Sequence, residues 1–351
     1  MIKVLIVDDS ALIRQLLGKI LSSDPGLEVV GSAPDPHVAR RLIKETNPDV
    51  ITLDIEMPKM DGLSFLEKIM RLRPTPVLMI SSLTQKGADA TLRSLELGAV
   101  DFIGKPKMDV QHGLSGAAEE ILAKVKAAAG AKVRPLAAVP AAGDRPARRI
   151  SYSSTEWIIA IGASTGGVTA LRDVICGLPA DCPATLITQH MPAKFTATFA
   201  PRLNAASAVT VKEAADGDRV LPGHVYLAPG DRHMELARSG ANYVVRLNDA
   251  PPVSGHRPSV DVLLGSVAGM AGNRGVGVIL TGMGRDGASG LLEMRRAGAM
   301  TIGQDEATSV VYGMPKAAQE IGAVTRQLPL QKIADAILES CGDSKVRAVR
   351  V

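Results

Sequence analysis

Aromatic side chains are scarce in this sequence: Phe, Trp and Tyr make up 3% of its 351 residues. Proteins that bind single-stranded nucleic acids stack bases on aromatic platforms, so this scarcity argues against that class. Excess positive charge is also limited, since the net charge is +4 and much of it lies in residues 127–153. That stretch is better interpreted as a basic linker than as a binding face, and we predict no nucleic-acid partner.

Cysteines and long apolar segments are few as well. The three cysteines, Cys176, Cys182 and Cys341, match no zinc or redox spacing, so we expect reduced thiols in a cytosolic protein. No apolar run approaches the length that spans a bilayer, and the first residues lead into a strand-like segment without a signal-peptide pattern. We therefore expect a cytoplasmic protein with no direct membrane insertion.

The length and composition predict two globular domains. Domains usually hold about 100–200 residues. A content of 46% hydrophobic and 22% charged residues is ordinary for a folded chain. A stretch rich in Ala, Pro, Gly and Arg, without a sustained apolar period, is typical of an extended linker. We place the N-terminal domain at residues 1–125, the linker at 126–153, the C-terminal domain at 154–343 and a tail at 344–351.

Short apolar stretches alternate with helical spacing through the N-terminal domain. Five such strand–helix units with right-handed crossovers predict an α/β fold, with a five-stranded, doubly wound parallel sheet covered on both faces. The expected strands are 3–7, 28–31, 50–53, 77–80 and 102–103, and the expected helices are 11–21, 38–45, 63–71, 88–97 and 117–125.

The C-terminal domain repeats the α/β alternation and adds a different segment in its middle. Short β signals at 225–227, 234–237 and 243–247, separated by Gly, Pro and Asn, predict an added β-hairpin. We therefore expect a doubly wound, mainly parallel α/β domain with a hairpin. The other expected strands are 157–161, 184–188, 276–280 and 300–302, and the expected helices are 168–175, 193–203, 260–271, 291–297 and 330–339.

Charged side chains follow three strands of the first sheet. Asp8 and Asp9 end the first strand, Asp54 ends the third and Lys105 follows the fifth. Because the carboxyl ends of neighbouring parallel strands share one edge, these groups should meet in one crevice, with the hydroxyl of Ser81. Clustered carboxylates suit Mg²⁺, one of them can form an acyl phosphate, and a Lys can hold phosphoryl oxygens. Each residue alone also fits a simpler role in a cap or a turn.

Residues 1–125 resemble the receiver domain of bacterial response regulators. The resemblance rests on Val-Leu-Ile-Val-Asp-Asp-Ser at 4–10, Asp54, Met57-Pro58, Asp61-Gly62, Ser81-Ser82 and Gly104-Lys105-Pro106. It implies that Asp54 accepts phosphate from a histidine kinase, and that Ser81 and Phe102 are the switch hydroxyl and the switch aromatic residue. It also implies a Mg²⁺ site formed by Asp8, Asp9, Asp54 and the backbone carbonyl of Glu56.

A glycine-rich turn, Gly162-Ala163-Ser164-Thr165-Gly166-Gly167, lies between an expected strand and an expected helix. Three interpretations are open: a phosphate cradle, a Gly-x-Ser-x-Gly turn that presents a nucleophile, or an ordinary Ser cap with permissive glycines. The dinucleotide spacing Gly-x-Gly-x-x-Gly and the Lys of a Walker motif are absent, which argues against a nucleotide-binding module.

Two further residues favour the nucleophile interpretation. His190 and Asp286 each follow an expected strand, so both should reach the sheet edge that carries Ser164. The three form a nucleophile, a general base and a carboxylate that orients the imidazole. Simpler roles are a structural histidine and a helix cap, and His256 is a rival base. The chain order Ser–His–Asp differs from the α/β-hydrolase order, which argues against that fold.

Residues 155–340 resemble the catalytic domain of the CheB chemotaxis methylesterase family. The resemblance rests on Ile-Gly-Ala-Ser-Thr-Gly-Gly at 161–167, Gln-His-Met-Pro at 189–192, Ser-Val-Asp-Val-Leu at 259–263, Thr-Gly-Met-Gly-Arg-Asp-Gly at 281–287, and 303–306 with 312–315. It implies hydrolysis of methyl esters on chemoreceptor glutamates, and often deamidation of receptor glutamines. The implied partners are a chemotaxis-type histidine kinase and the cytoplasmic helices of methylated chemoreceptors. It also implies that the receiver inhibits the enzyme until Asp54 is phosphorylated.

The expected mechanism is nucleophilic attack by the serine on the ester carbonyl, with the histidine as base and the aspartate holding its tautomer. We expect the oxyanion to meet backbone N–H groups of Thr165 or Gly166 and one near Met283, each contributing roughly 3 kcal/mol. No metal or organic cofactor is expected in this domain.

Two other functions are weighed against this one. A response regulator with a transcriptional output would need a helix-turn-helix and a basic recognition face, and the C-terminal half shows neither pattern. A serine hydrolase of another ester or amide, under receiver control, would use the same three residues. The triad pattern by itself therefore leaves the ester or amide substrate open.

Overall fold

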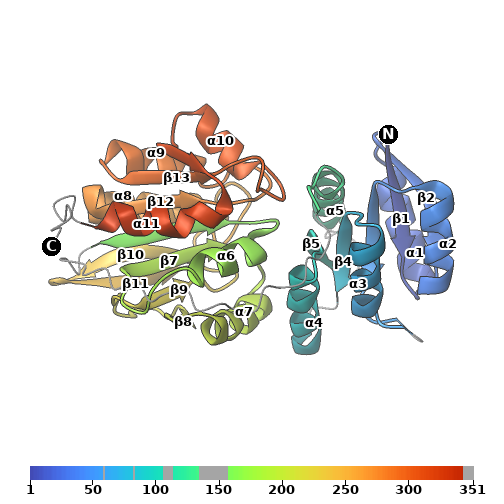
Figure 1. Ribbon diagram of the computed structural model, residues 1–351, viewed down its shortest axis with the longest axis horizontal. Coiled ribbons are helices and arrows are strands. Elements are labelled where there is room, and N and C mark those ends of the chain that lie inside the picture. The colour runs from blue at the N-terminus through green and yellow to red at the C-terminus, as the bar shows by residue number, and fades with distance from the viewer. Residues whose placement is uncertain (58–59, 82–83, 106–113, 134–156, 343–351) are drawn as a thin grey trace, which may run out of the picture. The chain divides into compact units, whose positions relative to one another are not determined.

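The computed structural model describes residues 1–57, 60–81, 84–105, 114–133 and 157–342. The chain divides into two compact units, Met1–Ala141 and Ala142–Val351 (Figure 1). Helix α5 (Leu114–Ala129) runs past residue 125, the predicted end of the first domain. Residues 134–153 of the predicted linker and the tail at 344–351 lie outside the described residues, so the predicted domain limits stay predictions.

The first unit contains a five-stranded sheet in the order β2-β1-β3-β4-β5. Every strand pair is parallel, which confirms the predicted fold. β3 and β4 are buried along their whole length, as expected for a sheet covered on both faces. The strand order reverses at β1, which is where open parallel sheets bind ligands, at the carboxyl ends of the strands. The strands are β1 (Ile2–Val7), β2 (Leu27–Ala33), β3 (Val50–Asp54), β4 (Val77–Ser81) and β5 (Asp101–Gly104).

The helices of this unit pack in two groups, α1 with α5 and α3 with α4. Ser10 caps α1 by accepting a hydrogen bond from the N–H of Ile13 (3.4 Å). Asp61 caps α3 in the same way through Ser64 (2.7 Å). The helices that join the strands are α1 (Ala11–Ser22), α2 (Pro36–Thr46), α3 (Gly62–Leu72) and α4 (Gln85–Glu96), with α5 after the last strand.

The second unit contains a seven-stranded sheet in the order β14-β13-β12-β6-β7-β9-β8. All of its strand pairs are parallel. A separate antiparallel pair forms the predicted hairpin, which confirms the fold class. The strands are β6 (Ile158–Ala163), β7 (Ala184–Gln189), β8 (Thr210–Glu213), β9 (His224–Leu227), β10 (His233–Ser239), β11 (Asn242–Asn248), β12 (Gly275–Ile279), β13 (Met300–Gln304) and β14 (Arg326–Leu328).

Helices of the second unit also form two groups. α8 packs against α9 and α9 against α10, while α6 packs against α7 and α11. The sheet order reverses at β6, which is buried throughout and lies between β7 and β12. In open parallel sheets ligands bind at the carboxyl ends of strands at such a reversal. The helices are α6 (Gly167–Ile175), α7 (Ala193–Ala206), α8 (Val260–Ala271), α9 (Ala288–Arg296), α10 (Met314–Glu320) and α11 (Ile333–Cys341).

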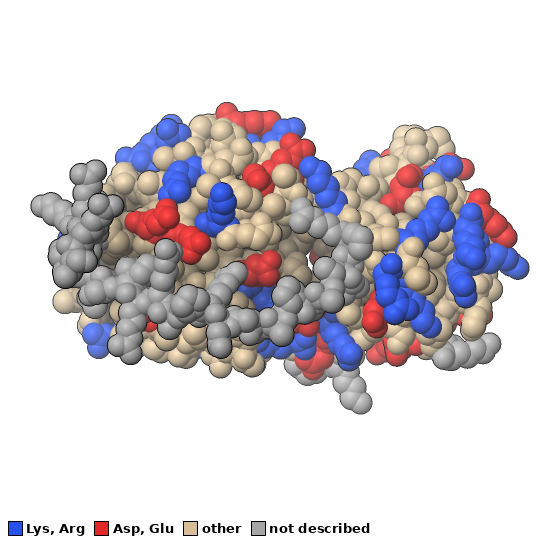
Figure 2. All heavy atoms as spheres, in the orientation of Figure 1, with Lys and Arg blue, Asp and Glu red and all other residues tan. Residues whose placement is uncertain are grey.

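Among the described residues, no helix combines the length and the apolar character that crossing a bilayer requires. On the face shown in Figure 2, the Lys and Arg side chains of each unit are interspersed with Asp and Glu. This mixed pattern agrees with the small net charge of +4.

Candidate functional site

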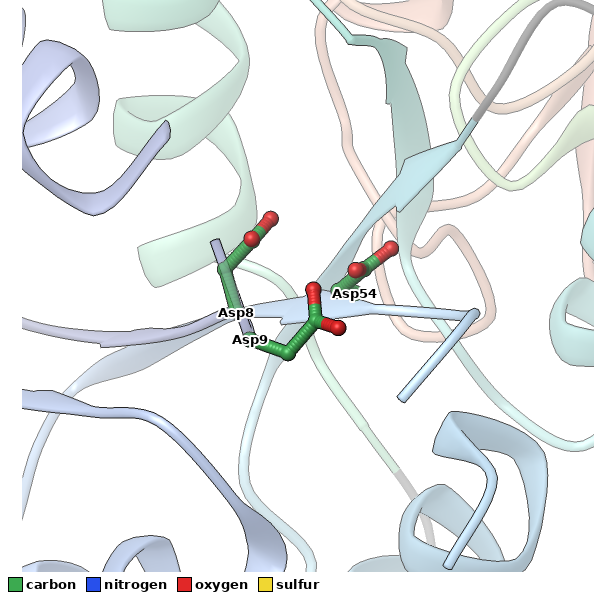
Figure 3. A group of neighbouring side chains, drawn as sticks. All are labelled: Asp8, Asp9 and Asp54. Carbon is green, nitrogen blue, oxygen red and sulfur yellow. The ribbon is translucent and has the colours of Figure 1, made fainter. Parts of the chain in front are cut away.

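Three carboxylates gather at the carboxyl edge of the first sheet (Figure 3). Asp8 and Asp9 follow β1 and Asp54 ends β3, and one oxygen of each lies within 4.8 Å of the other two. Asp8 and Asp54 are buried, whereas Asp9 is exposed. The N–H of Glu56 donates to Oδ1 of Asp54 (3.3 Å), so this residue lies beside the cluster. The role of the Glu56 carbonyl stays a prediction.

The electrostatics of this cluster fit a divalent cation. Burial and the charge of Asp54 raise the pKa of Asp8 to about 6. Oδ2 of Asp8 is buried and has no hydrogen-bond partner within the described part of the chain. A buried, unpartnered carboxylate oxygen beside two further carboxylates is stabilised when a hard cation accepts their lone pairs and offsets their charge.

Lys105 forms an ion pair with the predicted phosphate acceptor. Its Nζ lies 2.8 Å from Oδ2 of Asp54, whose side chain is 1% exposed. Burial raises the pKa of Asp54 and prevails over the ammonium, which lowers it. Burial alone would lower the pKa of Lys105. The hydrogen bond to Asp54 and the charge of that carboxylate have the larger, opposite effect, so the pKa of Lys105 lies above its ordinary value. The ammonium is therefore held beside this carboxylate.

The two predicted switch residues lie on neighbouring strands, Ser81 at the end of β4 and Phe102 on β5. Both are buried. Oγ of Ser81 lies 2.6 Å from Oγ1 of Thr91 on α4. Nζ of Lys124 donates to the carbonyl of Phe102 (2.8 Å) and lies 5.2 Å from the centroid of its ring. Each switch residue is thus tied to a helix, and its role in signalling stays a prediction.

Ser164 lies directly after β6, in the turn that opens α6. Its N–H donates to the carbonyl of Thr281 after β12 (3.0 Å), and its carbonyl accepts from the N–H of Gly167 (2.7 Å). Gly166 has a φ of +77°, and a Cβ there would lie 2.6 Å from Cβ of Val310. The turn therefore requires glycine at this position, and it leaves Ser164 partly exposed at the sheet edge.

His190 and Asp286 are in contact at the same edge. Nε2 of His190 lies 2.7 Å from Oδ2 of Asp286, and their side chains are 8% and 1% exposed. Asp286 also accepts hydrogen bonds from Oγ of Ser259 (2.8 Å) and from the N–H groups of Val260 (2.7 Å) and Asp261 (3.1 Å). Burial raises the pKa of Asp286, but the bond and charge of His190 and the backbone donors lower it to about 2. Asp286 is therefore an anion at neutral pH.

The bond to Asp286 determines which nitrogen of His190 can act as a base. An ionised carboxylate only accepts hydrogen bonds, so Nε2 carries the proton of the neutral ring and Nδ1 carries the lone pair. Nδ1 is buried and has no hydrogen-bond partner among the described residues, Ser164 included. The pairing of β6 with β7 aligns Ala163 with Gln189, so Ser164 and His190 leave the sheet at equivalent positions.

The predicted oxyanion donors lie in the turn after β6, which holds Ser164, and in the loop after β12. The N–H groups of Gly166 and Met283 donate no hydrogen bond within the described part of the chain. The carbonyl of Thr165, which is buried, accepts from Oγ1 of Thr281 (2.9 Å). A Cβ added to Gly282 would lie 2.8 Å from Cβ of Ser164, so the loop that carries Met283 passes directly over the serine. This geometry suits the predicted role of these residues.

The rival base, His256, lies against His190. The two rings are stacked, with centroids 3.7 Å apart and planes inclined by 10°. The carboxylate of Asp286 bonds His190, which favours His190 as the base. Sequence reasoning left two neighbours without a role: Gln189, whose Nε2 donates to the carbonyl of Ser164 (3.0 Å), and Ser259. The signals for Ser259 in the sequence are its place in the matching stretch 259–263 and its position as a helix cap before an apolar run.

Replacing Asp286 with Asn should destabilise the catalytic unit at pH 7 by about 2 kcal/mol, because its pKa falls from 3.8 to about 2 on folding. The carboxylate makes its full contribution to the free energy of unfolding above its pKa in the unfolded chain. That contribution is lost as the pH falls through the folded-state pKa of about 2. The difference in free energy of unfolding between wild type and variant should therefore become smaller in acid. Urea unfolding followed by the single tryptophan, Trp157 in the second unit, measures this gap. Equal gaps at pH 7 and pH 2 would contradict the expectation.

Comparisons with known proteins agree with both halves of this description. The CheB methylesterase family model matches residues 159–337, and the response regulator receiver domain model matches residues 4–112. A protein-glutamate methylesterase/protein-glutamine glutaminase of Chromohalobacter salexigens is 59% identical over 350 residues, which cover 100% of this chain and 99% of the relative. The protein of the same name from Bordetella parapertussis is 59% identical over 344 residues, with 97% and 98% covered.

The solved structures that match the chain include one that corresponds to the second unit. The CheB methylesterase catalytic domain of Thermotoga maritima is 40% identical, with a TM-score of 0.51, and covers 52% of this chain and 97% of that one. Together with the full-length relatives, this match accounts for the α/β unit that carries Ser164, His190 and Asp286. The chain belongs to the CheB methylesterase family and carries a response regulator receiver domain ahead of its methylesterase domain.

Proposed function

We propose that the protein hydrolyses methyl esters of glutamate side chains on chemoreceptors, releasing methanol, and deamidates receptor glutamines, under control of its receiver domain. The observation that carries the proposal is the 2.7 Å contact between His190 and Asp286, at the sheet edge beside Ser164. The name of the full-length relatives supports the two substrates. The partners we propose are the cytoplasmic helices of methylated chemoreceptors and a chemotaxis-type histidine kinase.

The first chemical step is attack by Oγ of Ser164 on the ester carbonyl. Nδ1 of His190 takes the hydroxyl proton, while Nε2–H stays bonded to Asp286. The carboxylate stabilises the imidazolium without being protonated, which the pKa of about 2 for Asp286 supports. The N–H group of Thr165 or Gly166 and that of Met283 would donate to the oxyanion.

The second step removes the alcohol and regenerates the serine. The imidazolium of His190 gives its proton to the methoxide, the carbon–oxygen bond breaks, and methanol leaves an acyl-enzyme on Ser164. His190 then takes a proton from water as the water attacks the acyl carbon. The bond to Ser164 breaks, its oxygen recovers the proton, and glutamate is released. A glutamine substrate follows the same steps and loses ammonia in place of methanol.

Phosphorylation of Asp54 is the proposed control. Bound Mg²⁺, held by the carboxylates of Asp8, Asp9 and Asp54 and the carbonyl of Glu56, would offset the charge of the acceptor site and of the phosphoryl group. Lys105 would bind a phosphoryl oxygen, because its ammonium already lies 2.8 Å from the acceptor carboxylate.

The switch residues would respond to the new phosphoryl group. Its oxygens would compete with the carbonyl of Gly87 on α4 for the hydroxyl proton of Ser81, which lies at the end of the neighbouring strand. That exchange would loosen the tie between β4 and α4, and Phe102 on β5 would repack in turn. The phosphorylated state of Asp54 is thereby transmitted to a helix of the receiver domain.

Removing divalent cations with EDTA should lower receiver phosphorylation by a small phosphodonor by about 100-fold or more, since a bound cation contributes several kcal/mol of charge stabilisation. Incorporated phosphate measures the effect, and added Mg²⁺ should restore it. Methanol release without a phosphodonor serves as the internal control and should not change. Undiminished phosphate incorporation in excess EDTA would contradict the metal site.

The function is tested by methanol release from methylated chemoreceptors, measured with and without a phosphodonor. We expect release by the full-length protein and a higher rate once the receiver is phosphorylated. Hydrolysis of a small ester or amide without any release from receptors would instead support a serine hydrolase with another substrate. No change with the phosphodonor would remove the proposed control.

A further inference from the structure

Helices α8 and α9 exchange their N-terminal hydrogen bonds. Asp286 precedes α9, yet its carboxylate accepts from the N–H groups of Val260 and Asp261 at the start of α8. In return, Oδ1 of Asp261, in the first turn of α8, accepts from the N–H of Gly290 in the first turn of α9 (2.8 Å). The first N–H groups of a helix have no acceptor within the helix itself. In each of these two helices, a carboxylate from the other segment accepts from such groups.

The exchange depends on a close approach of the two helix starts. A Cβ added to Gly290 would lie 2.8 Å from the carbonyl oxygen of Asp261. Gly287 has a φ of +89°, and a Cβ there would lie 2.4 Å from a methyl of Val260. Gly287 is the N-cap residue of α9 and has no side chain that could accept a hydrogen bond. Within the described structure, the carboxylate of Asp261 takes that role by accepting from the N–H of Gly290.

This arrangement constrains the carboxylate that orients the base. Asp286 lies directly before Gly287, so any movement of the start of α9 moves Asp286 relative to His190. Holding α9 against α8 through Asp261 keeps Oδ2 of Asp286 2.7 Å from Nε2 of His190. A displacement of about 1 Å in a catalytic group can lower a rate about 100-fold, so this support bears on the reaction.

We infer that Asp261 is a positioning residue for the hydrolysis: its carboxylate fixes the start of α9 and, through it, the carboxylate of Asp286. The inference rests on the proposed role of Asp286 in catalysis. Asp261 acts as a hydrogen-bond acceptor, since Gly290 needs only an oxygen in place. Its negative charge is not required and is opposed by burial and by the neighbouring charge of Asp286, which raise its pKa.

The test compares Asp261→Ala with Asp261→Asn in the full-length protein. Alanine removes the acceptor, and we expect kcat for methanol release to fall about 10- to 100-fold with KM within about twofold of wild type. Asparagine keeps an oxygen that can accept from Gly290, so its kcat should stay within about threefold of wild type. Asp216→Ala is the matched control, because Asp216 accepts one backbone N–H, from Leu247 (2.7 Å), elsewhere in the same unit.

A spectroscopic readout separates positioning from general weakening of the fold. In ¹⁵N-histidine-labelled protein, the Nε2 proton of His190 bonded to Asp286 should give a downfield signal that Asp261→Ala shifts or loses and Asp261→Asn retains. Wild-type kcat and an unchanged signal in Asp261→Ala would overturn the inference, as would equal losses in the two variants. Should the alanine variant fail to fold, Gly290→Ala, which obstructs the same approach, should give the same loss of kcat and signal, and normal values there would overturn it.

An Asp286→Ala arm distinguishes this inference from the function on which it rests. An inactive Asp286→Ala with a fully active Asp261→Ala would refute the positioning role alone. An active Asp286→Ala would refute the catalytic role of the carboxylate itself. The histidine signal needs no substrate, so it reports on the geometry even if methylated receptors prove to be the wrong substrate.

Discussion

Alanine at position 164 should abolish methanol release, with kcat lower than wild type by at least about 10⁴-fold, the scale expected when a serine nucleophile is removed. The reason is that no other hydroxyl stands in the turn between β6 and α6 where the loop after β12 closes over the serine, apart from Thr165, which is buried. The measurement is the initial rate of methanol release from methylated receptors, with full-length protein and a saturating phosphodonor.

The Ser164→Ala variant should fold normally, because Oγ of Ser164 makes no hydrogen bond within the described part of the chain. Its circular dichroism and its unfolding in urea should therefore match the wild type. Ser239→Ala, which removes an exposed hydroxyl at the end of β10, is the matched control and should retain full activity. Turnover within tenfold of wild type in the Ser164 variant would end the nucleophile assignment.

The placement of the site could be predicted because parallel α/β sheets deliver strand ends to one edge. Ser164, His190 and Asp286 were assigned to the ends of three strands, and the sheet order places β12, β6 and β7 side by side. The same reasoning brought Asp8 and Asp54 together at the ends of β1 and β3. These predictions need only the order of apolar segments and the polar residue that ends each one.

The contacts within the site could not be predicted in this way. Which nitrogen of His190 meets Asp286 depends on side-chain rotamers, and the stacking of His256 depends on the path of a loop. The bond from Ser259 to Asp286 was hidden because a serine before an apolar helix already has an ordinary explanation as a cap. The exchanged bonds of Asp261 join segments whose separation in space no local pattern records.

Three elements of the second unit were missed for a different reason. β8 and β14 are short and half-exposed, so they lack the continuous apolar run that identified the inner strands. They lie at the two edges of the sheet, where burial is incomplete. Helix α10 has seven residues and a proline in its first turn, too short a span to show a helical period.

Replacing Asp54 with Asn should reduce phosphate incorporation from a small phosphodonor to background and remove the stimulation of methanol release. An amide oxygen cannot serve as the nucleophile that forms an acyl phosphate. The change keeps the size of the side chain and removes the negative charge that pairs with Lys105 at 2.8 Å. Incorporated phosphate and the ratio of stimulated to basal release measure the two effects on one protein preparation.

The control for this variant is Asp49→Asn, in which a carboxylate that accepts from the N–H of Lys3 (2.8 Å) is lost from the same domain, just before β3 begins. It should keep both phosphate incorporation and stimulation, because β3 separates it from the acceptor at the strand's other end. Stimulation that survives in Asp54→Asn without incorporated phosphate would mean that the receiver acts on the esterase by a route other than Asp54. Phosphate that is still incorporated would place the acceptor on another side chain, with Asp8 and Asp9, the other carboxylates of the cluster, as the candidates.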